Sequence, residues 1–79
     1  MLIIKLFVKD NCQQCLMTER WLVEHQIKFK TINLTENPNW AESLKKRGFQ
    51  STPVVYTGTE FWTGFRPQKL NQLNTEHAR

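Results

Sequence analysis

The chain has 79 residues, of which 11 are Lys or Arg and 7 are Asp or Glu, so its formal net charge is +4. This length excludes a second domain, because domains rarely have far fewer than ~50 residues, and we expect residues 1–79 to form one domain. Two cysteines are too few for a disulfide-scaffolded secreted mini-protein and for a four-cysteine metal site, so we expect them to serve chemistry.

Neither a targeting signal nor a nucleic-acid site is indicated. The N-terminal apolar run ends at Lys5, too early for a signal peptide or a membrane span, so we expect a cytoplasmic protein with no membrane partner. The densest basic patch covers only residues 45–47. It is too short for a nucleic-acid interface and is typical of a solvated helix end.

The first half of the chain predicts two strands with a helix between them. Residues 2–8 form an apolar run rich in strand formers, and residues 9–11 contain turn and cap types. The second half of residues 27–34 is a second strand. A helix over residues 15–25 is predicted from apolar residues at helical spacing: Leu16, Met17, Trp21, Leu22 and Val23.

The second half predicts a helix, a hairpin and a last helix. Asn37 as an N-cap before Pro38 begins a helix that ends at Gly48, with its cations in the last turn. Residues 54–56 and 60–63 are the strands of the hairpin. Pro67 opens the last helix, and residues 74–79 are expected to be a polar tail.

The resulting order is β-α-β-α-β-β-α. Two parallel strands joined by a helical crossover, together with an antiparallel hairpin, form one mixed sheet. We therefore expect an α/β thioredoxin-like fold, with a four-stranded mixed sheet flanked by three helices.

The chemistry is expected at Cys12-Gln13-Gln14-Cys15, between a strand and a helix. Cys12 would face the terminal N–H groups and the positive end of the helix dipole, which favour the attacking thiolate. Cys15, one turn further in, would be more shielded and would attack second. Gln13 and Gln14 add no charge. Lys9 either supports the thiolate or is an ordinary exposed lysine.

Two other interpretations of the cysteines stay open. A zinc site would need two more ligands, and the only histidines, His25 and His77, lie 52 residues apart. A zinc-linked interaction module would therefore need two chains, and we expect no metal within one chain. Two buried structural thiols are the other alternative.

Thr52-Pro53 and Trp62 each have two interpretations. A Thr-Pro bond that enters a strand beside a dithiol is a candidate cis-proline, which would leave the backbone of Thr52 free to pair with an extended substrate. The alternative is a trans proline at a strand start. Trp62 either packs in the core, as we expect for Tyr56 and Phe65, or presents a flat apolar surface for docking.

Three motifs together resemble the glutaredoxin-like NrdH redoxins: the Cys-x-x-Cys of residues 12–15, Thr52-Pro53, and the Trp-Thr-Gly-Phe-Arg-Pro block of residues 62–67. The resemblance implies that Cys12 is the nucleophile and Cys15 the resolving cysteine. It also implies a monomer with no bound cofactor. Electrons would come from NADPH through the flavoprotein thioredoxin reductase and pass to the large subunit of a class Ib ribonucleotide reductase.

One departure separates the chain from glutathione-dependent glutaredoxins, which have a Gly-Gly pair followed by an acid. Here Gly64 has the first place, Phe65 the second, and Arg66 follows, so we expect weak or no glutathione binding. A glutathione-dependent glutaredoxin remains the main alternative. The residues expected to contact substrate or partner are Lys9, Gln13, Gln14, Thr52, Pro53, Trp62, Gly64, Phe65 and Arg66.

Overall fold

The computed structural model describes residues 3–77, with side chains through residue 73. Its elements are β1 (Ile4–Val8), α1 (Gln13–Glu24), β2 (Phe29–Asn33), α2 (Pro38–Lys46), β3 (Val54–Tyr56), β4 (Phe61–Thr63) and α3 (Pro67–His77). The predicted element order is confirmed. None of the helices in this part of the chain is both long and apolar enough to cross a membrane.

The four strands form one mixed sheet in the order β2-β1-β3-β4. Strand β1 runs parallel to β2, with Ile4 opposite Phe29, and α1 is the crossover that joins them. Strand β3 is antiparallel to β1 and also to β4, with which it forms the hairpin. The predicted thioredoxin-like topology is therefore confirmed.

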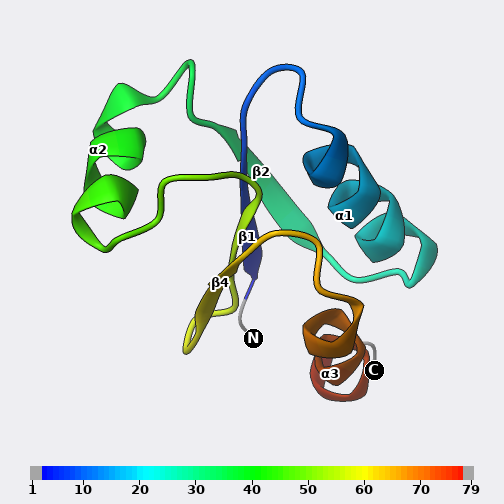
Figure 1. Cartoon of the computed structure of the whole chain (residues 1–79). Helices are drawn as coiled ribbons and strands as arrows, with labels where there is room; N and C mark the ends of the chain where they lie inside the picture. The colour runs from blue at the N-terminus through cyan, green and yellow to red at the C-terminus, as the bar shows by residue number, and fades with distance from the viewer. Residues whose placement is uncertain (1–2, 78–79) are drawn as a thin grey trace.

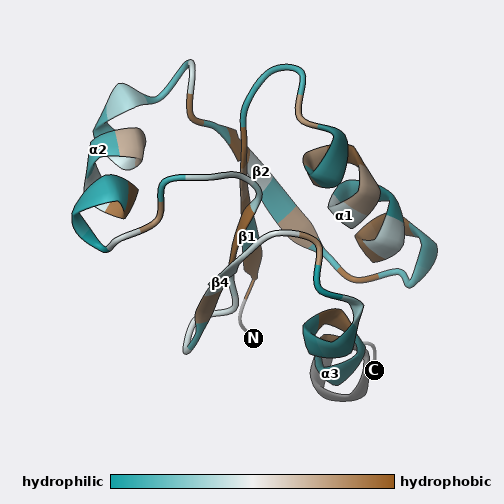
Figure 2. Ribbon diagram, in the orientation of Figure 1, coloured by the Kyte–Doolittle hydropathy of each residue, from teal (hydrophilic) through white to brown (hydrophobic). Residues whose placement is uncertain are grey.

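Helices cover both faces of this sheet. Helix α2 lies on one side of the strands, and α1 and α3 lie together on the other (Figure 1). Strand β1 is largely hydrophobic, whereas the helices have long hydrophilic stretches (Figure 2). A strand with both faces covered is expected to be mostly apolar, and β1 is apolar at every position except Lys5.

The core has two parts because side chains alternate across β1. Ile4, Leu6 and Val8 pack with residues of α1 and α3, including Leu22. Phe7 points to the other face and packs with Leu44 of α2. The dithiol lies at the α1 side of the sheet, where the larger of the two clusters includes Cys15.

The predicted buried face of α1 is wrong in part. Leu22 is buried, but Leu16, Met17 and Val23 are 56%, 43% and 64% exposed. The face toward the sheet consists of Cys15, Thr18 and Leu22, which are spaced three and four residues apart. Thr18 is buried, but its hydroxyl keeps a hydrogen-bond partner because it donates to the carbonyl of Gln14 at 2.9 Å.

Two helix ends also differ from the prediction. Asn37 is at the N-cap of α2, but its side chain makes no cap bond and instead donates to the carbonyl of Asn33 at 2.8 Å. Helix α3 continues to His77, so the expected tail from residue 74 is helical there. No Gly or Pro stands between Leu73 and His77 to stop it, and residues 78–79 lie outside the described part.

Candidate functional site: the dithiol at the start of α1

Cys12 and Cys15 form a disulfide at the first turn of α1, with their Cα atoms 5.2 Å apart. Cys12 is the N-cap residue, with extended backbone, and the preceding Asn11 has a positive φ of 58°. Asparagine is one of the few residue types that tolerate this conformation. The turn thus carries the chain from β1 into α1 with a cysteine in the place usually taken by Ser, Thr, Asp or Asn.

The Cys12 sulfur receives two hydrogen bonds. The backbone N–H of Cys15 donates to Cys12 Sγ at 3.2 Å, and the hydroxyl of Thr52 donates to it at 3.4 Å. The first turn of α1 contains no acidic residue that would oppose a negative charge. Donors and a helix N-terminus that converge on one sulfur stabilise a thiolate there once the disulfide is reduced.

The two sulfurs differ in access. Cys12 is partly exposed, whereas Cys15 is only 2% exposed and belongs to the core cluster. An external disulfide can therefore reach Cys12 but not Cys15. This asymmetry agrees with the predicted order of attack.

Thr52 approaches the dithiol through the turn that precedes β3. The Thr52-Pro53 peptide bond is cis, and Pro53 is fully buried, with its carbonyl accepting from the N–H of Gly64 at 2.8 Å. Within residues 3–77, we find no hydrogen bond to the backbone N–H or carbonyl of Thr52. Both groups are therefore available to an extended chain beside Cys12.

Gln14 joins the dithiol turn to the loop before α3. Its Oε1 accepts from the backbone N–H of Phe65 at 3.1 Å. A Cβ on Gly64 would make only an ordinary contact with the same oxygen, at 3.4 Å, so it is the positive φ of +88° that favours glycine at this position. Gln13 is exposed. The 51-residue separation explains why no local pattern predicted the Gln14 contact.

Trp62 does not present its ring to a partner. It is 6% exposed and packs in the cluster on the α1 side of the sheet, so the docking interpretation is wrong and the core interpretation is confirmed. Its position on the short strand β4 turns it inward opposite Val55. Phe65 is partly buried and packs against the same cluster, as does Cys12.

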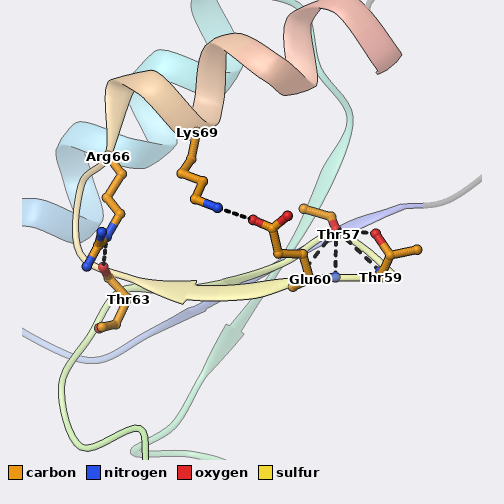
Figure 3. A network of polar contacts seen from close by, with 6 residues as sticks. All are labelled: Thr57, Thr59, Glu60, Thr63, Arg66 and Lys69. Atoms are coloured by element: carbon orange, nitrogen blue, oxygen red, sulfur yellow. Dashed lines mark hydrogen bonds and ion pairs between the residues drawn. The ribbon is translucent and has the colours of Figure 1, made fainter.

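Arg66 turns toward the hairpin. Its side chain is exposed, and its Nε donates to the carbonyl of Thr63 at 2.9 Å (Figure 3). One turn on, Lys69 pairs with Glu60 at 2.5 Å, and both side chains are roughly half exposed. Figure 3 shows both cations reaching from the start of α3 to the hairpin strand. The Lys69–Glu60 pair links the first turn of α3 to the hairpin, and the Arg66 bond closes the loop between β4 and α3.

Lys9 is exposed and lines the same hollow as Cys12 and Cys15. Its ammonium is thus on the dithiol side of the molecule, as both interpretations of Lys9 allow.

For a metal, the described part of the chain offers no group of three or more Cys, His, Asp or Glu side chains. His25 stacks on Trp21 with ring centroids 3.7 Å apart, and its Nδ1 lies 2.8 Å from the Trp21 carbonyl. His25 is thus engaged within its own helix.

The Thr52 hydroxyl supplies one testable contribution to the site. Because a donor to the sulfur favours the thiolate, we expect Thr52→Val to slow alkylation of reduced Cys12 at neutral pH by about three- to tenfold. Thr52→Ser keeps the hydroxyl and should stay within about twofold of the original rate. Iodoacetamide kinetics on the freshly reduced proteins measure this. Equal rates for Thr52→Val and Thr52→Ser would show that the hydroxyl has no such role.

Comparison with known proteins gives a consistent result. The glutaredoxin family model matches residues 4–62. The glutaredoxin-like protein NrdH of Lactococcus lactis subsp. cremoris is 39% identical over 70 residues, which cover 89% of this chain and 97% of the relative. The protein of the same name from Salmonella typhimurium is 37% identical over 76 residues, covering 95% of this chain and 94% of the relative.

Solved structures agree with the sequence relatives. The NrdH-redoxin from Escherichia coli, a glutaredoxin-like protein with a thioredoxin-like activity profile, superposes with a TM-score of 0.86 at 37% identity. The match covers 89% of this chain and 92% of that one. A glutaredoxin from Archaeoglobus fulgidus, at 24% identity and a TM-score of 0.79, covering 92% of this chain and 86% of that one, shares the fold.

Proposed function

The chain belongs to the glutaredoxin family and, within it, to the NrdH-type redoxins, and we propose that it carries electrons from thioredoxin reductase to a class Ib ribonucleotide reductase. It is a thiol-disulfide oxidoreductase whose redox group is the cysteine pair of residues 12–15. The proposed donor is a flavoprotein that takes its electrons from NADPH. The proposed acceptor is a disulfide on the large subunit of the reductase.

In the proposed cycle, Cys12 attacks first. Its thiolate bonds to one sulfur of the substrate disulfide, the substrate S–S bond breaks, and the departing thiolate takes a proton from water. Cys15 then loses its proton and bonds to Cys12 Sγ, which breaks the mixed disulfide and frees the second substrate thiol. The substrate gains two electrons and two protons, and the protein is left with the Cys12–Cys15 disulfide.

The observation that supports this cycle most directly is the unequal setting of the two sulfurs. Cys12 is reachable and accepts hydrogen bonds from the Cys15 N–H and the Thr52 hydroxyl, whereas Cys15 is buried one turn behind it. A buried second sulfur meets only a partner already bonded to the first. Because the Cα atoms of the two cysteines are only 5.2 Å apart, Cys15 is within reach of a mixed disulfide at Cys12 and can release the product.

The loop before α3 supports a reductase protein as the electron donor in place of glutathione. The backbone N–H of Phe65 already donates a hydrogen bond to the side chain of Gln14. The next residue is the cation Arg66, whose Nε donates to the carbonyl of Thr63. The Phe65 N–H is therefore unavailable to a carboxylate of glutathione, and the Arg66 cation repels the ammonium group of glutathione.

Reconstitution with purified components tests the proposal. Oxidised class Ib ribonucleotide reductase should form deoxyribonucleotides when given this protein, thioredoxin reductase and NADPH. Omitting this protein or omitting thioredoxin reductase should reduce the amount of deoxyribonucleotide to background. In a parallel mixture, glutathione and glutathione reductase replace thioredoxin reductase. Faster turnover with the glutathione mixture would establish the alternative, a glutathione-dependent glutaredoxin. The cytoplasmic location remains a prediction from sequence.

A further inference from the structure

A groove separate from the hollow at the disulfide lies between α2 and the ends of β1 and β3. It has a volume of about 500 Å³, and its lining includes the segment that connects α2 to β3. Figure 1 shows this segment running from the end of α2 to the centre of the sheet. The apolar part of the lining comes from Leu34, Ala41, Leu44, Phe49 and Val54.

Two residues connect this groove with the dithiol. Thr52 lines the groove and donates its hydroxyl to Cys12 Sγ at 3.4 Å. Lys9 lines both the groove and the hollow that contains Cys12 and Cys15. A chain whose disulfide lies at Cys12 can therefore continue into the groove, past the unpaired backbone groups of Thr52.

The groove has a single sign of charge. Among the residues that the structure describes, the ionisable ones in its lining are Lys9 at the dithiol end and Lys45 in the last turn of α2, and both are exposed. None of the acidic side chains in the described part of the chain lines it. An occupant that complements this lining has carboxylates and an apolar side chain between them.

We propose that this groove binds an extended acidic segment of the disulfide-bearing partner, so that Lys9 and Lys45 select substrates with carboxylates flanking their cysteines. The inference rests on the proposed function, because it concerns the partner of the same dithiol. The pairing mode is that of a peptide that aligns its backbone with Thr52 while its side chains meet the groove.

The chain offers a matched control for Lys45. Lys46 is the next residue of the same last helical turn, so the two contribute alike to net charge and to the helix dipole. Lys46 does not line the groove and pairs instead with Glu42 at 3.9 Å. An effect of the groove must therefore depend on Lys45 and not on Lys46.

Two synthetic peptides test the proposal, each with the same internal Cys-x-x-Cys disulfide but with Glu or Gln residues on both flanks. The protein is reduced with dithiothreitol, desalted and mixed with each oxidised peptide, and the rate of peptide reduction is followed by acid quenching, alkylation and mass spectrometry. We expect the Glu peptide to react several-fold faster at low salt, and this preference should shrink in 0.5 M salt.

Substitutions then locate the preference. Lys45→Ala should lower the rate for the Glu peptide by about two- to fivefold and Lys45→Glu by about tenfold, while the Gln peptide changes little. Lys46→Glu should have a much smaller effect. Equal rates for the two peptides, or equal effects of Lys45→Glu and Lys46→Glu, would overturn the inference. Failure to reduce either peptide would instead contradict the proposed function.

Discussion

Cys12→Ser is expected to abolish disulfide reduction, with residual turnover at the level of a mixture without protein. Serine keeps the shape of the N-cap and can still accept from the Cys15 N–H, so the fold should survive. The serine hydroxyl is not ionised near neutral pH and does not attack disulfides. Cys15 is too buried to replace Cys12 as the nucleophile. NADPH oxidation with thioredoxin reductase and a disulfide substrate measures the loss.

Cys15→Ser is the matched comparison, and its expected result is different in kind. Cys12 can still attack, but nothing resolves the bond, so a mixed disulfide with the partner should accumulate. Non-reducing electrophoresis would show a product of the summed mass that dithiothreitol removes. A Cys12→Ser protein that turned over normally, or trapping by Cys12→Ser in place of Cys15→Ser, would reverse the assigned roles.

Phe7→Ala is expected to cost about 3–5 kcal/mol of unfolding free energy. Phe7 is fully buried in β1, pairs with β2 and β3 neighbours, and contacts the Trp40 ring at 5.0 Å between centroids. The free energy of unfolding of a native protein is only about 5–15 kcal/mol, so this substitution should remove a large part of the stability of the domain. Urea denaturation followed by circular dichroism measures the difference.

Val23 supplies the control for that experiment. It is apolar but 64% exposed on α1, so Val23→Ala should change stability by less than about 0.5 kcal/mol. A cost for Val23→Ala that matched the cost for Phe7→Ala would contradict the burial pattern of both positions, and with it the observed face of α1.

The fold was predictable because its signals are local. The apolar run of β1, the Asn37-Pro38 start of α2 and its Gly48 stop are each visible within a few residues, and a right-handed crossover then determines the topology. The rotation of α1 was not predictable in the same way. Leu16 and Val23 are more apolar than Thr18, yet Thr18 is on the buried side of α1 with Cys15 and Leu22, and the hydrogen bond of its hydroxyl within the helix makes this burial tolerable.

The dithiol was predictable from the spacing of its two cysteines, but its surroundings come from distant parts of the chain. Thr52 and Cys12 are 40 residues apart, and Gln14 and Phe65 are 51 apart, so only the folded sheet brings these pairs together. Trp62 was ambiguous because a tryptophan in a three-residue strand points inward or outward according to register, which pairing with Val55 sets. Lys45 fits a helix C-terminus in sequence, and its place on the groove appears only in three dimensions.

The most direct test of the central claim counts the thiols that each electron donor generates. The oxidised protein is incubated either with thioredoxin reductase and NADPH or with glutathione, glutathione reductase and NADPH. The free thiols are then alkylated, and the mass of the chain is measured by mass spectrometry. We predict two alkyl groups per chain after brief incubation with the thioredoxin reductase mixture, and predominantly unmodified chains after the same time with the glutathione mixture. Rapid modification by the glutathione mixture alone would contradict the claim that this redoxin receives its electrons from thioredoxin reductase.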